Sequence, residues 1–100
     1  MSDDMANPQY INMFYYLYLL LLNNGQIYTG STGDLKRRLA EHMAGRVKFT
    51  RQRLPAKLIH YEAYKNKIDA QRRERYLKTT QGKKFLKQQI KELLIQLNKI

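Results

Sequence analysis

Apolar positions in the first third of the chain predict a β-hairpin. A mostly apolar run from Met13 to Leu22 is followed by an Asn-Gly pair and by a shorter strand-forming run, Gln26 to Thr32. Near-continuous apolarity is typical of a central strand that is covered on both faces, and an Asn-Gly pair between two such runs indicates a hairpin turn. Gly30 and Gly33 mark positions where the backbone can bend closely around another group.

A helix is predicted directly after the hairpin. Leu35, Leu39 and Met43 recur at helical period. Asp34 is a natural N-cap and Gly45 a natural C-terminal stop, so we expect the helix to run to about residue 44.

The polar side chains of this helix are distributed unevenly about its axis. At about 100° per residue, Arg38 and His42 lie beside Leu35 at the edge of the apolar stripe. Arg37 and Glu41 face away by the same count. We therefore expect a cation and an imidazole to point toward the hairpin.

The second half of the chain predicts one more strand and two more helices. Pro55 precedes a strand from Ala56 to Tyr64, within which we interpret His60 as structural. The two faces of this strand would be Leu58, His60 and Glu62 on one side and Ile59, Tyr61 and Ala63 on the other. Asn66 begins a capping-box sequence for a helix from Lys67 to Lys78.

The last predicted helix follows Thr80, which can cap it. Its broad apolar stripe must pack on the sheet or on a partner protein. The stripe consists of Leu86, Ile90, Leu93, Leu94 and Leu97. Residues 1–12 are polar and aperiodic, so we interpret them as a flexible N-terminal arm and expect a single domain over residues 13–100.

The charge balance indicates a polyanionic partner. The net charge is +11, from 19 Lys and Arg against 8 Asp and Glu. Such an excess opposes compaction through self-repulsion, so nucleic acid is the expected partner and an anionic membrane surface the minor alternative. The run from Met13 to Leu22 is too short for the roughly 20 residues of a membrane-spanning helix, and no basic signal segment precedes it. We therefore expect a soluble, cytoplasmic protein.

A loop of four cations and no acid separates the first predicted helix from the third strand. The cations surround Phe49 and Thr50 and are Arg46, Lys48, Arg51 and Arg53. A solvated surface is the simpler interpretation, but this pattern suits a phosphate backbone better.

Glu74 interrupts the narrow apolar stripe of the second predicted helix. Ala70, Glu74 and Leu77 share one helical face, and a carboxylate there is costly to bury unless it is paired or coordinates a metal. The simpler alternative is an ion pair with one of the nearby arginines, Arg72, Arg73 or Arg75. The chain has no cysteine, so a metal ion would be held through oxygen or through the two histidines, His42 and His60.

Four short motifs, taken in this order, resemble those of the GIY-YIG nuclease family, in particular its small stand-alone bacterial members and the catalytic domains of homing endonucleases. They are Tyr16-Leu17-Tyr18, Tyr28-Thr29-Gly30, Arg38 with His42, and Glu74. Tyr16 and Leu17 replace the glycine and isoleucine of the first motif, and Thr29 replaces the isoleucine of the second. The remaining motif residues are retained, and the resemblance covers residues 14 to 86.

The resemblance implies a fold and a chemistry. The fold is α+β, with a three-stranded antiparallel sheet flanked by three helices. The activity is metal-dependent endonucleolytic hydrolysis of DNA, in DNA repair or recombination, with association with the nucleoid when DNA is bound. The catalytic residues would be Tyr18, Tyr28, Arg38, His42 and Glu74, and substrate would be bound by Gly30, Arg46, Lys48, Arg51 and Arg53.

Physical roles can be assigned to the catalytic set. Glu74 would hold one Mg²⁺ or Mn²⁺ ion, and Arg38 would hold the phosphate oxygens. Tyr18 or Tyr28 would accept the proton of water, which requires a lowered phenol pKa. His42 could orient a tyrosine or shuttle a proton.

Simpler interpretations stand beside these roles. The tyrosines could be ordinary strand aromatics, and His42 could be a helix C-terminal cation stabilised by the macrodipole. The whole protein could be a non-catalytic nucleic-acid-binding module, or an adaptor that uses the leucines of the last helix.

The hairpin loop decides whether both tyrosines can serve one site. A two-residue turn at Asn24-Gly25 would place Tyr18 and Tyr28 on opposite faces of the sheet. The nuclease hypothesis therefore predicts a three-residue loop, residues 23 to 25, with Gly25 at positive φ and a bulge. That loop pairs Leu20 with Tyr28 and puts the two tyrosines on one face.

Overall fold

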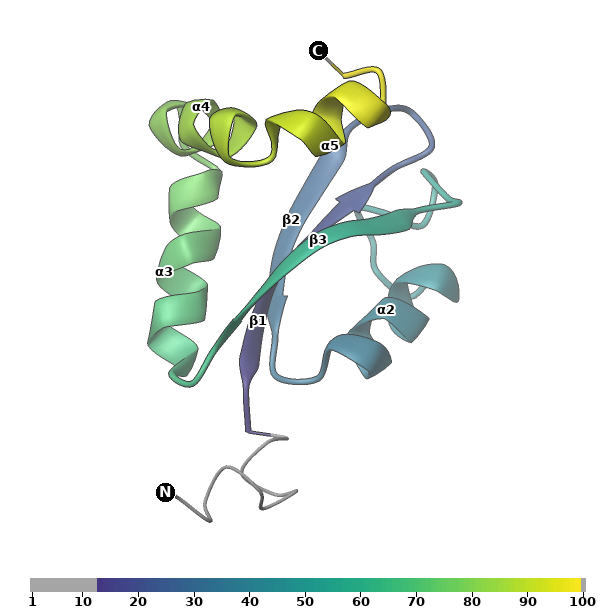
Figure 1. Cartoon of the computed structure of the whole chain (residues 1–100). Helices are drawn as coiled ribbons and strands as arrows, with labels where there is room; N and C mark the ends of the chain where they lie inside the picture. The colour runs from purple at the N-terminus through teal and green to yellow at the C-terminus, as the bar shows by residue number, and fades with distance from the viewer. Residues whose placement is uncertain (1–12, 100) are drawn as a thin grey trace.

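The computed structural model describes residues 13–99, and the expected arm over residues 1–12 lies outside them (Figure 1). In chain order the elements are β1 (Tyr15–Leu21), β2 (Ile27–Thr32), α2 (Leu35–Met43), β3 (Lys57–Tyr64), α3 (Lys67–Leu77), α4 (Thr80–Gln89) and α5 (Lys91–Gln96). The predicted α+β class is confirmed. No helix in this part of the chain has the length and apolar character needed to cross a membrane.

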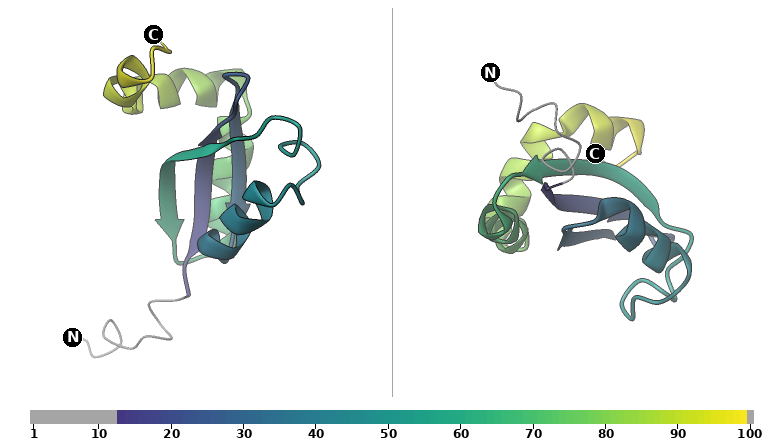
Figure 2. Two further views of the ribbon diagram at one scale, coloured as in Figure 1. Left: turned by 90° about the vertical axis from the view of Figure 1, so that its right-hand side faces the viewer. Right: turned by 90° about the horizontal axis from the view of Figure 1, so that it is seen from below.

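The sheet is antiparallel, with the strand order β2-β1-β3. The apolar first strand is therefore central, as predicted, and Leu17, Leu19 and Leu20 have no exposed surface. Two further views show α2 and the loop after it on one face of the sheet and α3 on the other (Figure 2). Each face of β1 thus has its own apolar cluster.

The face toward α3 carries the larger apolar cluster. Its buried members are Leu17, Leu19, Leu77, Leu86, Ile90 and Leu94. Leu86, Ile90 and Leu94 of the last predicted helix are therefore core residues, which removes the adaptor hypothesis that needed this stripe as a docking surface.

The prediction of three helices was wrong, because the last one is divided into α4 and α5. Ile90 ends α4 with φ −114° and ψ 34°. The chain changes direction there, so that both Leu86 on α4 and Leu94 on α5 stay buried against the same cluster. The N-cap of α4 is Thr79 rather than Thr80, since the Thr79 side chain accepts a hydrogen bond from the Gly82 N–H.

The hairpin prediction was correct. Leu20 pairs with Tyr28, and the Leu22 N–H donates to the Gln26 carbonyl at 2.8 Å while the Leu22 carbonyl accepts from Gly25 at 3.0 Å. Gly25 has φ 87°, the left-handed conformation that a one-residue bulge after a turn requires. The odd loop length places Tyr18 and Tyr28 on the same face of the sheet.

The strict alternation predicted for the third strand was wrong. Leu19 pairs with His60 but Leu20 pairs with Leu58, so Ile59 is an extra residue in β3. On one side of such a bulge, each side chain points to the opposite face of the sheet from the one that strict alternation would give. Leu58 therefore lies on the α2 face, whereas Ile59 packs against the cluster on the α3 face.

The predicted caps of the first two helices are confirmed. The Asp34 side chain accepts a hydrogen bond from the Arg37 N–H at the start of α2, and Asn66 accepts one from Ile68 at the start of α3. Gly45, after α2, has φ 76°. On the apolar stripe of α2, however, Met43 is 45% exposed, so the buried end of that stripe is formed by His42.

Candidate active site

Four of the predicted catalytic residues meet on the α2 face of the sheet. Tyr18 comes from the middle of β1, Tyr28 from edge strand β2 at the position paired with Leu20, and Arg38 and His42 from α2. The ring centroids of Tyr18 and Tyr28 are 6.2 Å apart, and those of Tyr28 and His42 are 5.2 Å apart. The helical spacing of Arg38 and His42 thus brings both side chains to the two tyrosines, as the sequence predicted.

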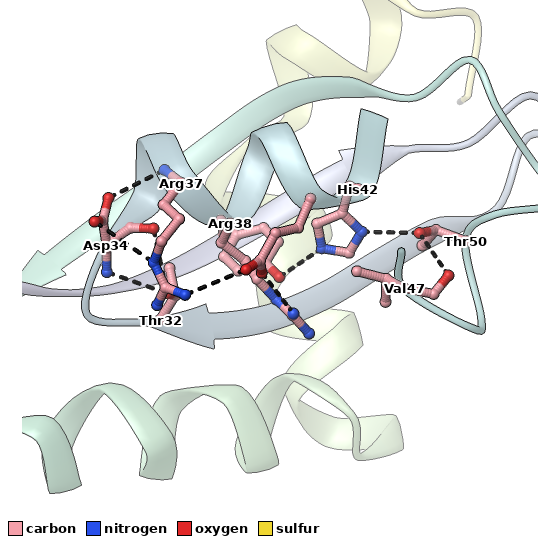
Figure 3. Close-up of polar contacts among 9 residues, drawn as sticks. Thr32, Asp34, Arg37, Arg38, His42, Val47 and Thr50 are labelled. Atoms are coloured by element: carbon pink, nitrogen blue, oxygen red, sulfur yellow. Dashed lines mark hydrogen bonds and ion pairs between the residues drawn. The ribbon is translucent and has the colours of Figure 1, made fainter. Parts of the chain in front are cut away.

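His42 lies at the centre of a buried chain of hydrogen bonds (Figure 3). Its Nε2 is 2.8 Å from the Tyr18 hydroxyl and its Nδ1 is 2.8 Å from Thr50 Oγ1. Thr50 Oγ1 in turn donates to the Val47 carbonyl at 3.5 Å. His42 and Thr50 have no exposed surface, so each ring nitrogen has one fixed partner.

The alternative role of His42 as a helix-terminal cation was wrong. Burial lowers the pKa of His42, and the nearby Arg38 guanidinium lowers it further. Both effects disfavour the charged imidazolium. His42 is therefore neutral near pH 7 and has a lone pair available.

Tyr18 does not meet the requirement for a lowered phenol pKa. Burial raises the pKa of Tyr18 to about 12, and the opposing hydrogen bond from Arg38 is too weak to reverse this. Desolvation of the phenolate thus outweighs the effect of the one partly exposed cation beside it. Removing the Tyr18 proton therefore needs a nearby acceptor, and His42 Nε2 is in contact with it.

Arg38 is fixed in place by an acid that was predicted to face away. Glu41 accepts from Arg38 Nη1 at 3.0 Å and from Arg37 Nη1 at 3.2 Å. The Glu41 side chain is only 24% exposed, whereas Arg37 is 64% exposed. The prediction for Glu41 was thus wrong, because its hydrogen bond to Arg38 draws it toward the site.

Glu74 reaches the same region from the opposite face of the sheet. Its Oε1 accepts a hydrogen bond from Ser31 Oγ on β2 at 2.6 Å, and its Oε2 accepts from Lys78 Nζ at 2.9 Å. Burial raises the pKa of Glu74, but these two donors and nearby cations outweigh burial and leave it lowered. Glu74 also raises the pKa of Tyr18 through its charge, so the two groups lie within electrostatic reach across edge strand β2.

The alternative of an arginine ion pair for Glu74 is not observed among the described residues. Among the described residues Glu74 pairs with Lys78, whereas Arg72 pairs with Asp69 and Arg73 with Glu62. Glu62 also accepts from Tyr64 at 2.7 Å and lies 3.0 Å from His60 Nε2. His60 therefore belongs to a separate structural cluster, in agreement with its interpretation from the sequence.

The donor set suits one hard cation held by a single carboxylate. No group of three His, Asp or Glu side chains gathers anywhere within residues 13–99. Glu74 is ionised at neutral pH and its second partner, Lys78, is 56% exposed and can move aside. Mg²⁺ keeps several waters and accepts one protein carboxylate together with substrate phosphates, so this chemistry fits.

The basic loop is anchored to the site at two points. Thr50 contacts His42, and the ring of Phe49 is 5.8 Å from that of Tyr28. Arg53 lies over Phe49, with its guanidinium carbon 4.4 Å from the ring centroid, and donates to the Phe49 carbonyl. Arg53 therefore holds the loop together, whereas Arg46, Lys48 and Arg51 are exposed.

Three partners in this region were missed by the sequence analysis: Ser31, Thr50 and Lys78. Ser31 and Lys78 contact Glu74, and Thr50 contacts His42. Only Lys78 carried a signal, because the i, i+4 spacing from Glu74 favours a helical ion pair.

A cavity of about 640 Å³ lies elsewhere on the α2 face, and it is lined by Tyr16, Gly33, Asp34, Leu35, Lys36, Leu39 and Tyr61. None of the predicted catalytic residues lines it.

Comparisons with known proteins agree with these motifs. A sequence model described as the GIY-YIG catalytic domain matches residues 14–88. A UPF0213 protein of Streptococcus agalactiae is 47% identical over 64 residues, which is 63% of this chain and 73% of the relative. A UPF0213 protein of Haloquadratum walsbyi is 37% identical over 83 residues, 82% of this chain and 91% of the relative.

One solved structure is also similar. The solution NMR structure of a UPF0213 protein from Bacillus halodurans is 36% identical and gives a TM-score of 0.48. The match covers 74% of this chain and 82% of that one.

Proposed function

The chain belongs to the GIY-YIG catalytic domain family, whose domain implies nuclease activity, and on that premise we propose that it is a metal-dependent endonuclease that hydrolyses DNA phosphodiester bonds. The observation that carries the proposal is the meeting of Tyr18, His42 and Arg38 on one sheet face, with the Glu74 carboxylate across the adjoining edge strand. These groups supply a proton acceptor, a fixed cation and an oxygen ligand, the three functions that hydrolysis of a phosphate diester needs.

Arg38 binds the non-bridging phosphate oxygens in this proposal. A guanidinium offers several donors in a planar fork and stays charged at all working pH values. Its hydrogen bond to Glu41 raises the pKa of Arg38 further and limits its freedom. The free donors can then face the phosphate without a large cost in side-chain entropy.

Glu74 would hold one Mg²⁺ or Mn²⁺ ion. When bound, such an ion stabilises negative charge on the phosphate and the leaving oxygen. Ser31 orients the carboxylate from β2 through its 2.6 Å hydrogen bond. Lys78 must leave Oε2 before a cation can take its place.

A tyrosine takes the proton of the attacking water, and both Tyr18 and Tyr28 face the required side of the sheet. His42 serves the proton transfer, since it is neutral near pH 7 and its Nε2 contacts the Tyr18 hydroxyl.

We assign the DNA backbone contact to Arg46, Lys48 and Arg51 of the basic loop, because they are exposed and the loop is attached to the site through Phe49 and Thr50. Arg53 acts within the loop. Gly30 contributes by seating Tyr18, whose ring occupies the space over it, rather than by contacting DNA. DNA as substrate would place the protein on the nucleoid and in repair or recombination.

A non-catalytic DNA-binding module is the competing function, because the raised pKa of Tyr18 keeps the phenol protonated at neutral pH unless His42 takes its proton. The two functions predict opposite results in a single experiment. The full chain is incubated with single-stranded, duplex, flap and branched DNA, with and without Mg²⁺, and both cleavage and binding are measured.

We expect Mg²⁺-dependent cleavage that falls about 10²- to 10³-fold in Arg38→Ala, because a donor to the transition-state charge is lost. Glu74→Gln should abolish the Mg²⁺-dependent cleavage, while circular dichroism shows an unchanged fold. Arg37→Ala is the matched control, since Arg37 is exposed one position away on the same helix. Binding without cleavage on every substrate would establish the non-catalytic module, and full activity of Glu74→Gln at saturating Mg²⁺ would remove Glu74 as the ligand.

A further inference from the structure

We propose that Thr50 is a positioning residue that keeps the His42 proton on Nδ1, so that Nε2 stays free to accept the proton of the Tyr18 hydroxyl. The inference rests on the proposed function for its catalytic consequence. Its structural part, the protonation pattern of His42, holds independently of any activity.

The direction of each hydrogen bond follows from Val47, the last residue in the series of hydrogen bonds that starts at Tyr18. Val47 offers a backbone carbonyl, which can only accept, so the Thr50 hydroxyl donates to it at 3.5 Å. With its single proton used there, Thr50 Oγ1 can only accept from His42 Nδ1, 2.8 Å away. Neutral imidazole carries one N–H, so Nε2 is left as an acceptor for the Tyr18 hydroxyl at 2.8 Å.

Burial favours this pattern over the other tautomer. Thr50 and His42 have no exposed surface, so water cannot replace a missing partner of the imidazole or of the Thr50 hydroxyl. A buried donor without an acceptor costs about 1–3 kcal/mol. With the proton on Nε2, the Tyr18 hydroxyl would have to accept from His42 and would lose the acceptor for its own proton.

The same geometry separates the two tyrosines. Both ring nitrogens of His42 are occupied, one by Tyr18 and one by Thr50. Tyr28 contacts His42 only through its ring, with the planes inclined by 68°. The direct path for a phenol proton to the imidazole therefore starts at Tyr18.

The proton balance of the step is closed. The Tyr18 O–H bond breaks and its proton binds Nε2, which leaves a phenolate beside Arg38 and an imidazolium. The phenolate takes one proton from water while the water oxygen bonds to phosphorus and the bond to the 3′ oxygen breaks. The leaving oxygen is protonated by solvent, and the buried His42 passes its extra proton back to the Tyr18 hydroxyl, which releases one proton to solvent.

The test is a measurement of the ¹⁵N chemical shifts and two-bond couplings of His42 in the full chain near neutral pH, for the wild type, Thr50→Ser and Thr50→Val. We expect a protonated Nδ1 and an unprotonated Nε2 in the wild type and in Thr50→Ser, which keeps the hydroxyl. Thr50→Val has nearly the same shape but no acceptor, so the proton should move to Nε2. If Thr50→Val does not fold, Thr50→Ala is measured in its place.

A proton on Nε2 in the wild type, or on Nδ1 in the variant that lacks the hydroxyl, would overturn the proposal. These spectra do not depend on cleavage, so a protein that proves inactive still gives a decisive result about Thr50. If cleavage is observed, kcat should fall about tenfold in the hydroxyl-free variant, the cost of one hydrogen bond. KM should stay unchanged and Thr50→Ser should restore kcat, whereas a rise in KM alone would contradict a role in the proton transfer.

Discussion

Tyr18 on the central strand and Gly30 on the edge strand lie directly opposite each other, and the Tyr18 ring occupies the space over Gly30. A Cβ at position 30 would be 2.6 Å from both Cζ and the hydroxyl oxygen of Tyr18. This relationship gives the glycine of the second motif a physical reason. Because Gly30 has no side chain, the Tyr18 ring can lie over it and the Tyr18 hydroxyl can reach His42.

Replacement of Gly30 by alanine should therefore displace Tyr18. We expect Gly30→Ala to lower the free energy of unfolding by about 1–3 kcal/mol, the usual cost of overpacking, as measured by urea denaturation. Gly33→Ala is the matched control, because a Cβ there would lie 3.4 Å from Tyr15, an ordinary contact. Equal stabilities of the two variants would show that the ring has room to move.

The buried histidine predicts a specific pH dependence of stability. Because the pKa of His42 is lowered in the folded state, the unfolded chain, with a histidine pKa near about 6.5, binds the proton first. Stability therefore falls as the pH decreases below about 6.5 and levels off below the folded pKa.

We expect the unfolding free energy of the wild type to decrease from about pH 7.5 to about pH 5.5 more than that of His42→Gln. The two proteins share every other titrating group, so the difference isolates His42. Glu62 and Glu74 also have lowered pKa values, but their contribution is lost only as the pH falls through those values, below this range. Parallel curves for the two proteins would contradict a buried neutral imidazole.

Lys78 should compete with the metal for Glu74. The ion pair between them is 2.9 Å long and its lysine is exposed, so it is worth about 0.2–1 kcal/mol. Lys78→Gln should therefore tighten Mn²⁺ binding by about 1.5- to 5-fold in isothermal titration calorimetry. Lys83→Gln, which removes the same charge from the next helix, provides the control. Weaker binding in the Lys78 variant would place the cation elsewhere.

The exposed cations of the loop should set the salt dependence of DNA binding. Each phosphate contact contributes about −0.9 to the slope of log K against log salt on duplex DNA. Changing Arg46, Lys48 and Arg51 to alanine should flatten that slope by up to about 2.7, as measured by fluorescence anisotropy. Arg53 is left in place because it holds Phe49.

The control for this experiment removes the same charge from α4 and α5, through Lys84→Ala, Lys87→Ala and Lys91→Ala. If only the loop variant flattens the slope, the loop carries the backbone contact. An effect confined to the helix variant would move the binding face to α4 and α5.

The local pattern of the sequence determined the elements that position the site. Continuous apolarity identified the central strand because both of its faces are covered. The caps Asp34 and Asn66 act within a few residues, so they too can be predicted. The three-residue hairpin loop followed from the requirement that two tyrosines share a face, since strand residues alternate with a period of two.

Contacts between distant segments were decided only by the tertiary structure. Thr50 and Ser31 meet His42 and Glu74 after the chain has folded back, and no local spacing records such a meeting. The bulge at Ile59 and the break at Ile90 arise from fitting a strand and a helix to a shared core. The pKa values of Tyr18 and His42 depend on burial, and burial is a property of packing that the sequence pattern does not contain.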